Sequence, residues 1–365
     1  MNFQVFRRHG TVPAGLVCAL TVIYGQSVMK LEQEPACQTL RPASTGGPLP
    51  KSPDVLVLRY FSYGNYEVAY RGKVLLLDAF YDNSRSPLAV PAGLKESDIT
   101  RADAILVGHT HLDHFADAPA IAKRTGAPVF LAPPGLGYVR AHGLPENQIH
   151  IVRGGETVKQ AGYTIQTALG IHMVTPPDAS KAYNEFVKKS SPLTPEQQKQ
   201  FSDWLTPISQ AATVNEDPLD PDNDTIYHGT IVYVLTFDSG FRLVYSDTAG
   251  VLSGGERVLA DSIHTGGGKI DLAILGYLDG GFSVNRAIRN TLTRVKMWQP
   301  GILLPSHFHD GDLVYPIPMP EMPTAPLLEA LRDQTPKTRG ISPLFRSPVC
   351  VNTQTGEFFV GDYVH

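Results

Sequence analysis

The sequence predicts a layered α/β fold that is built from short apolar strands. Three strands are expected at the start of the body, over Val55–Tyr60, Tyr66–Tyr70 and Lys73–Asp78. An apolar run at Ala104–Val107 is followed by a helical pattern over Ala116–Arg124 and by another apolar run at Pro128–Ala132. Because short continuous apolar runs are typical of strands buried on both faces, the alternation of strand and helix indicates a sheet covered by helices.

A second group of strands follows in the other half of the chain. It begins in a strand-rich stretch over Ile149–Ile171. A hairpin and two buried strands continue it, over Thr230–Phe237, Phe241–Ser246, Asp271–Leu275 and Gly301–Pro305. A helix over Val284–Trp298 is expected between the last two strands. The chain therefore contains two β-rich halves.

Residues 176–226 interrupt this second group of strands. They begin with Pro176 and Pro177, continue with two helix-like stretches and then form an acidic loop. Long segments of this kind inside a compact domain are often functional. We interpret this segment as a partly helical insertion that could form a lid, with Phe201 and Trp204 able to line it over an apolar substrate.

The composition limits the classes of function. The chain has 365 residues, of which 42% are hydrophobic, so it can bury a sizeable core. It carries 31 basic and 35 acidic residues, with a net charge of −4 and no long run of like charge. A nucleic-acid partner is not expected, because such proteins usually carry a basic patch or stripe.

The N-terminal residues have the pattern of a secretory signal peptide. A basic segment at residues 7–9 precedes an apolar run over Val12–Tyr24 and a small, polar exit that ends at Ser27. A permanent transmembrane helix needs about 20 apolar residues, so no stable membrane span is expected. A buried N-terminal strand is the alternative. We therefore expect an exported protein, either periplasmic or secreted. Its predicted organisation is a signal peptide over 1–27, an irregular leader over 28–52 and one domain over 53–365.

Two cysteines would remain in the mature chain after cleavage near Ser27. Cys37 lies in the leader and Cys350 lies near the C-terminus. In an oxidising compartment they could form one disulfide that ties the leader to the C-terminal region. They could equally be two unpaired thiols, because spacing in the sequence does not show proximity.

The strongest chemical signal is the segment HTHLDH at residues 109–114, which directly follows an apolar strand. In an extended segment His109 and His111 point to the same side, so both imidazoles can reach one ion. The turn into the following helix can bring Asp113 and His114 toward a second ion. Imidazole and carboxylate ligands suit Zn²⁺, and also Fe and Mn. The alternative is a packed or pH-sensitive histidine cluster.

Three single residues downstream lie at or just beyond the carboxyl ends of apolar strands: His172, Asp247 and His307. Open α/β sheets build their sites at these ends. We interpret His172 as a third nitrogen ligand of the first ion and Asp247 as a bridge between two ions. His309 competes with His307, which we prefer because it follows its strand more directly.

The segment HTHLDH resembles the H-x-H-x-D-H signature of the metallo-β-lactamase superfamily, and His172, Asp247 and His307 follow in the order that this family uses. The resemblance covers most of residues 55–310. It looks most like the branch that contains ascorbate-6-phosphate lactonase and N-acyl-phosphatidylethanolamine phospholipase D. It implies an αββα sandwich, here with a partly helical insertion, and a binuclear metal site along one edge.

The resemblance also implies a ligand set for two divalent ions, zinc before manganese or iron. The first ion would be held by His109, His111 and His172, the second by Asp113, His114 and His307, with Asp247 bridging. This chain departs from the family where the common Gly-Asp-Thr is Ser246-Asp247-Thr248 and where residues 176–226 lengthen the usual spacing. The second departure concerns the substrate rather than the ions.

The expected function is metal-dependent hydrolysis, in which a metal-bridged hydroxide cleaves an ester, a lactone or a phosphoester. Asp113 is the expected catalytic residue, since it could orient water in addition to binding an ion. His228 and His309 are candidate proton donors to the leaving group or substrate contacts. The expected partner is a small-molecule or lipid-like substrate, and the sequence does not define an oligomeric state.

Three alternatives remain open at this stage. The first is an exported β-lactamase that acts on cyclic amides, against which the carboxylate of Asp247 argues, because true β-lactamases generally lack it. The second is a di-iron redox protein on the same fold, although such relatives usually carry a flavin domain. The third is a metal-binding protein without catalysis, which the complete set of apparent ligands disfavours.

Overall fold

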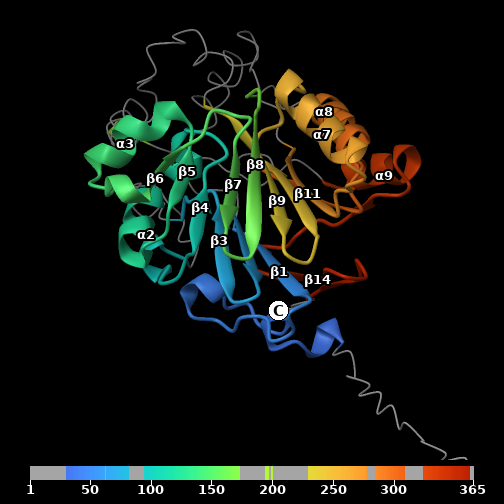
Figure 1. Cartoon of the computed structure of the whole chain (residues 1–365), viewed down its shortest axis with the longest axis horizontal. Helices are drawn as coiled ribbons and strands as arrows, with labels where there is room; N and C mark the ends of the chain where they lie inside the picture. The colour runs from blue at the N-terminus through green and yellow to red at the C-terminus, as the bar shows by residue number, and fades with distance from the viewer. Residues whose placement is uncertain are drawn as a thin grey trace, which may run out of the picture.

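Two β-sheets pack face to face in the computed structural model, and helices cover their outer faces (Figure 1). The structure describes residues 30–61, 63–81, 94–172, 194–196, 199, 229–277, 284–308 and 324–361. The predicted signal peptide and nearly all of the predicted insertion lie outside these residues, as do His228 and His309.

The first sheet has eight strands within the described ranges, in the order β15-β14-β1-β2-β3-β4-β5-β6. Strands β1 to β3 form an antiparallel meander, whereas β3 to β6 run parallel. The bounds are β1 Val55–Tyr60, β2 Tyr66–Tyr70, β3 Lys73–Leu77, β4 Ala104–Leu106, β5 Val129–Leu131, β6 Ile149–Ile151, β14 Pro348–Asn352 and β15 Phe358–Val360. The opening strands therefore form where the apolar patterns predict them.

The second sheet has seven strands in the same described part of the chain, in the order β13-β12-β11-β10-β9-β8-β7. Strands β7 to β10 are antiparallel to their neighbours, whereas β10 to β13 run parallel. The bounds are β7 Thr157–Gln160, β8 Tyr163–Leu169, β9 Ile231–Phe237, β10 Arg242–Ser246, β11 Leu272–Gly276, β12 Ile302–Ser306 and β13 Arg339–Gly340. The predicted hairpin corresponds to β9 and β10.

The α-helices of the described residues are α1 Leu112–Phe115, α2 Ala118–Thr125, α3 Leu136–Ala141, α7 Gly254–Thr265, α8 Val284–Trp298 and α9 Thr324–Gln334. The short 3₁₀ turns are η1 Leu31–Gln33, η2 Pro35–Cys37, η3 Ala43–Thr45, η5 Glu96–Asp98, η6 Pro133–Gly135 and η7 Glu146–Gln148. The structure confirms the predicted helix α8. Within the described ranges, no helix has the length and apolar character needed to cross a bilayer.

Helix α2 begins two residues later than the predicted helix over Ala116–Arg124. The carboxylate of Asp117 accepts the Tyr81 N–H at 2.6 Å, and its own N–H donates to the Ala79 carbonyl at 3.0 Å. These contacts tie the chain before α2 to the end of the first sheet. The helix ends at Gly126, whose φ of 79° is readily adopted only by glycine.

Three apolar layers hold the two sheets and their helices together. Between the sheets, side chains from both inner faces interdigitate, among them Leu58, Leu75, Leu235, Tyr245 and Ile274. A second layer lies between the first sheet and helices α2 and α3, and a third lies between the second sheet and helices α7, α8 and α9. The helix–sheet–sheet–helix order confirms the expected αββα sandwich.

The predicted irregular leader packs against the first sheet. It contains η1 to η3, and a disulfide joins Cys37 to Cys350 of β14. The carboxylate of Glu67 accepts the N–H groups of Ala43 and Ser44 at 3.0 and 2.7 Å. The structure thus pairs the two cysteines that the sequence left either paired or free.

We predict that replacing both cysteines, Cys37→Ser with Cys350→Ser, lowers the free energy of unfolding by about 2–5 kcal/mol. The physical reason is the 313-residue separation of the two cysteines, because the bond removes much of the entropy of the unfolded chain. Urea denaturation followed by circular dichroism measures the change. A reductant should reproduce the loss in the natural chain and have no effect on the variant; equal midpoints for both proteins would contradict the prediction.

Candidate metal centre

The seven predicted ligand residues gather where strands of both sheets end. Four of them, His109, His111, Asp113 and His114, lie in the segment that leaves β4 and enters α1. The other three come from the second sheet: His172 lies three residues beyond β8, Asp247 directly follows β10 and His307 directly follows β12. The sheets therefore bring together residues that are far apart in the sequence.

These residues form three groups of donor atoms, each with all its atoms within 4.8 Å of one another. The groups are His109, His111 and His172; His109, His114 and Asp247; and Asp113, His114 and His307. Because His109 and His114 each belong to two groups, the three groups form one continuous cluster. All seven predicted ligands are members of it.

Asp247 lies at the centre of the cluster and is completely buried. Its Oδ2 atom lies 2.6 Å from His109 Nδ1 and 3.0 Å from His114 Nδ1. Its Oδ1 atom has no hydrogen-bond partner among the described residues. A buried carboxylate oxygen without a partner is costly, and a cation would satisfy it.

His114 links the centre of the cluster to the outer ligands. Its Nε2 atom lies 3.0 Å from His307 Nε2 and 3.4 Å from Asp113 Oδ2. Asp113 Oδ2 also lies 3.5 Å from His307 Nε2. With 26% of its side chain exposed, Asp113 is more open to solvent than Asp247.

Burial and neighbouring charges shift the pKa values of His109, His114 and Asp247 in different directions. Burial lowers the pKa of His109 to about 4, so this imidazole is neutral at pH 7. Burial also acts to lower the pKa of His114, but Asp113, Asp78 and Asp247 outweigh it and raise the pKa well above its usual range. For Asp247, burial acts to raise the pKa, yet His109 and His114 hold it well below its usual range. The cluster thus contains a neutral imidazole and an ionised carboxylate, the forms that bind metals.

Asp78 is a site residue that the sequence prediction missed. Its Oδ2 atom lies 2.5 Å from His114 Nδ1, and its Oδ1 atom accepts the Gly108 N–H at 2.7 Å. Burial raises the pKa of this carboxyl to about 6. Asp78 could have been predicted from its position directly after β3, because Asp247 was identified by the same position directly after β10. Because it holds Nδ1, Asp78 orients His114 and leaves Nε2 facing Asp113 and His307.

Gly64 provides the space in which these acidic groups meet. A Cβ atom at Gly64 would lie 2.1 Å from Asp78 Oδ2, 2.9 Å from His114 Nδ1 and 3.0 Å from Asp247 Cβ. No side chain fits there. Tyr245 fixes the Gly64 backbone by donating its hydroxyl to the carbonyl at 3.1 Å.

The end of β12 is held by the backbone of Tyr63. The carbonyl of Tyr63 accepts the His307 N–H at 2.7 Å and the Ser306 hydroxyl at 3.1 Å. The Tyr63 ring meets the His307 ring edge-on, with ring centroids 5.8 Å apart. His307 has a φ of 53°, an uncommon value for a residue with a side chain, so these contacts keep it in an unusual conformation.

The donor set fits a divalent transition-metal ion. It consists of imidazole nitrogens and carboxylate oxygens, which suit zinc, iron and manganese. Asp78 hydrogen-bonds the ring nitrogen of His114 from behind, as is usual for a metal-binding histidine. A cation would also satisfy Asp247 Oδ1, for which the described residues supply no hydrogen-bond donor.

Sequence comparisons match the region that contains the HTHLDH segment. Residues 73–191 match the β-lactamase superfamily domain. A UPF0173 metal-dependent hydrolase of Anaeromyxobacter dehalogenans is 37% identical over 105 residues, which cover 28% of this chain and 35% of that protein. A protein of the same description from Pyrobaculum neutrophilum is 32% identical over 102 residues, 28% of this chain and 44% of that protein. The matches thus span less than half the length of these curated relatives.

Solved structures share the fold over most of the chain. Igni18, described as a novel metallo hydrolase from Ignicoccus hospitalis, covers 85% of this chain and 100% of its own, with a TM-score of 0.50 and 13% identity. CmlA, a diiron β-hydroxylase from Streptomyces venezuelae, covers 82% of this chain and 55% of its own, with a TM-score of 0.51 and 14% identity. At these identities the likeness concerns the fold alone. The chain is thus similar to the β-lactamase superfamily domain over residues 73–191, and it shares the fold of these two solved structures over most of its length.

Proposed function

We propose that this chain is a metal-dependent hydrolase and that the cluster around Asp247 is its reaction centre. The observation that carries the proposal is the buried Asp247 carboxylate, which contacts His109 and His114 with one oxygen and finds no hydrogen-bond partner for the other within the described part of the chain. The curated relatives described as metal-dependent hydrolases support the same function.

The proposed centre holds two divalent ions, with zinc preferred over manganese or iron. His109, His111 and His172 would hold the first ion, and Asp113, His114 and His307 the second, with Asp247 between them. Divalent ions in such a site lower the pKa of bound water and polarise the oxygen of a carbonyl or phosphoryl group. The sharing of His109 and His114 between donor groups supports two adjacent positions rather than two separate sites.

The chain's own residues have distinct tasks in this proposal. Asp113 is the proposed catalytic residue, because its carboxylate is partly open to solvent and can accept a hydrogen bond from water. Burial acts to raise the pKa of Asp113, but His114 and His307 hold it well below its usual range, so the carboxylate is ionised at neutral pH. Asp78 keeps the His114 ring in place from behind. His228 and His309 remain candidates for proton donation to the leaving group.

The proposed substrates are esters, lactones or phosphoesters of small or lipid-like molecules. The resemblance to the branch with ascorbate-6-phosphate lactonase and N-acyl-phosphatidylethanolamine phospholipase D supports this range. The Asp247 carboxylate also supports it, since it distinguishes the chain from the true β-lactamases.

Metal content and turnover of the purified chain test this function. We expect about two zinc or manganese ions per chain and chelator-sensitive hydrolysis of one class among an ester, a lactone and a phosphodiester. His111→Ala should lose metal and turnover together, because it removes one donor of the first group. Plasma emission spectrometry of the metals and initial rates on the three substrates provide the readouts.

A matched control is His264→Ala, which removes a histidine of α7 that contacts the Met297 carbonyl outside the cluster. It should retain metal and turnover. Full activity of His111→Ala would contradict the proposed centre. Cleavage of nitrocefin in place of the three substrates would indicate a β-lactamase, and an iron absorption band without hydrolysis would indicate a redox protein.

We predict that Asp78→Asn weakens zinc binding by about 10–100-fold, as loss of a group behind a metal-binding histidine usually does. The substitution keeps the shape and removes the charge beside His114. Titration with a competing chelator at pH 8, where a carboxyl with a pKa of about 6 is ionised, measures the change.

The same substitution at Asp103, which pairs with Lys73 at 2.9 Å away from the cluster, is the control. Its zinc affinity should equal that of the natural chain. If Asp78→Asn also binds zinc with unchanged affinity, Asp78 does not orient His114.

We also propose an exported location, in the periplasm or outside the cell. The secretory pattern over residues 1–27 supports it, and so does the disulfide between Cys37 and Cys350, because such bonds persist in oxidising compartments. Cell fractionation with N-terminal sequencing is expected to find a chain shortened near Ser27 outside the cytoplasm. A cytoplasmic chain that retains the first 27 residues would contradict this location.

A further inference from the structure

A fully buried ion pair joins α7 to α8 on the outer side of the second sheet. Arg294 of α8 donates from Nε to Glu256 Oε1 at 2.9 Å and from Nη2 to Glu256 Oε2 at 3.2 Å. Their side chains are 1% and 0% exposed. Charges removed from water this completely are costly, and replacing such a pair by apolar side chains is often no loss for stability. The contacts that the pair makes beyond itself therefore indicate its role.

The guanidinium group also holds the loop that follows β10. Arg294 donates from Nη1 to the Gly250 carbonyl and from Nη2 to the Val251 carbonyl, the latter at 3.4 Å. Asn290, one turn earlier on α8, donates to the Ala249 carbonyl at 2.9 Å. Helix α8 thus fixes three consecutive carbonyls that begin two residues after the proposed bridging carboxylate.

This loop is in direct backbone contact with the segment that carries His172. A Cβ atom at Gly250 would lie 1.8 Å from the Ile171 oxygen and 2.7 Å from the His172 carbonyl carbon. Only a glycine permits this approach, so the loop and the Ile171–His172 peptide pack without an intervening side chain. A displacement of one therefore displaces the other.

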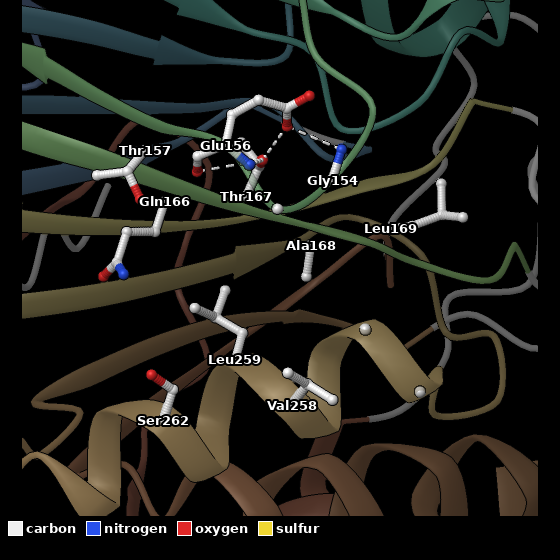
Figure 2. A pocket seen from close by; sticks show the side chains of 13 residues that line it. Gly154, Glu156, Thr157, Gln166, Thr167, Ala168, Leu169, Val258, Leu259 and Ser262 are labelled. Carbon is white, nitrogen blue, oxygen red and sulfur yellow. Dashed lines mark hydrogen bonds between the residues drawn. The ribbon is translucent and has the colours of Figure 1, made fainter.

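A second connection joins the loop to the end of β8. The Ser253 hydroxyl donates to the Leu169 carbonyl at 2.6 Å and accepts the Glu256 N–H at 2.9 Å. Glu256 Oε2 in turn accepts the Ser253 N–H at 3.0 Å. Figure 2 shows α7 alongside β8, with Leu169 and Val258 among the residues that line a pocket of about 450 Å³ between them. Glu256 thus binds both the guanidinium of α8 and the residue that attaches the loop to β8.

We propose that Arg294 and Glu256 are a positioning pair that sets the distance between Asp247 and His172. The inference rests on the proposed metal centre and goes beyond it, because neither side chain belongs to the ligand cluster. The pair acts through the backbone of residues 247–253, at whose start Asp247 lies and against which the His172 segment packs. In this way α7 and α8 hold two ligands that the second sheet supplies from different strands.

The chemistry of the pair requires arginine rather than lysine. A planar guanidinium can bind both oxygens of a carboxylate and still direct a third nitrogen at a carbonyl group. A lysine ammonium keeps the charge but cannot hold Glu256 and the Gly250 carbonyl in this fixed geometry. Arg294→Lys therefore separates the positioning role from the charge.

Two variants test the inference from different sides. Arg294→Lys weakens the hydrogen bonds from α8 to the Gly250 and Val251 carbonyls. Gly250→Ala retains the ion pair but pushes the loop away from the His172 segment. We expect each to weaken the binding of at least one zinc equivalent by tenfold or more, measured by titration with a competing chelator. The midpoint of thermal unfolding of each variant without zinc is measured alongside.

The chain contains a matched control. Arg59 and Glu67 form another fully buried pair, 3.3 Å apart, and Arg59 also donates to the carbonyls of Ala36 and Thr39 at 2.7 and 3.1 Å. This pair ties the leader to the first sheet, and neither residue belongs to the ligand cluster. Arg59→Lys should lower the thermal midpoint as Arg294→Lys does and leave both zinc affinities unchanged.

The outcomes distinguish this inference from the proposed function. Weaker zinc binding in Arg294→Lys and Gly250→Ala, with normal binding in Arg59→Lys, supports the positioning role. If the natural chain binds two zinc ions and both test variants bind them equally well, the positioning role is overturned and the metal centre stands. If Arg294→Lys does not fold, Gly250→Ala decides alone. A natural chain that binds no zinc overturns the metal centre and the positioning pair together.

Discussion

The carboxylate of Asp247 imposes the constraint on which the rest of the site depends. A carboxylate removed from water loses several kcal/mol of hydration, which close partners must offset. Its partners, His109 and His114, come from the first sheet, whereas Asp247 itself ends a strand of the second sheet. The carboxylate is therefore tolerable only when the two sheets are docked with the correct separation. The inter-sheet layer of apolar side chains provides that separation.

The balance of charge around His114 explains why the cluster favours a cation. Three carboxylates, those of Asp113, Asp78 and Asp247, raise the pKa of this one imidazole, and burial suppresses the protonation of His109. The cluster therefore carries more negative than positive charge when these acids are ionised. A bound divalent ion would offset this excess, and His114 would have to lose its proton to serve as a ligand. Gly64 makes this arrangement possible because it has no side chain; a Cβ atom there would collide with Asp78 and Asp247.

Local patterns in the sequence predicted two β-rich halves and the seven clustered residues, whereas the αββα sandwich was implied by the family resemblance. His109 to His114 are consecutive, and His172, Asp247 and His307 follow strand ends. Asp78 obeys the same rule but no motif marks it. Helix α7, which the sequence prediction missed, begins with a capping box formed by Ser253 and Glu256. The roles of Gly64 and Gly250, and the pairing of β14 with β1, depend on contacts between distant segments, which periodicity cannot indicate.

Folding and ion binding should therefore be coupled through the docking of the sheets. One continuous segment that follows β4 of the first sheet supplies four of the seven donors. Each of the three donor groups is nevertheless completed by a residue of the second sheet. An ion that binds only the docked state stabilises it by about 2.7 kcal/mol at a concentration one hundred times its dissociation constant. That gain is large beside the roughly 5–15 kcal/mol that stabilises a typical protein. The buried pair Arg59–Glu67 stabilises the first sheet and its leader, and Arg294–Glu256 stabilises the helices on the second sheet. The ions, in contrast, would hold the two sheets to one another.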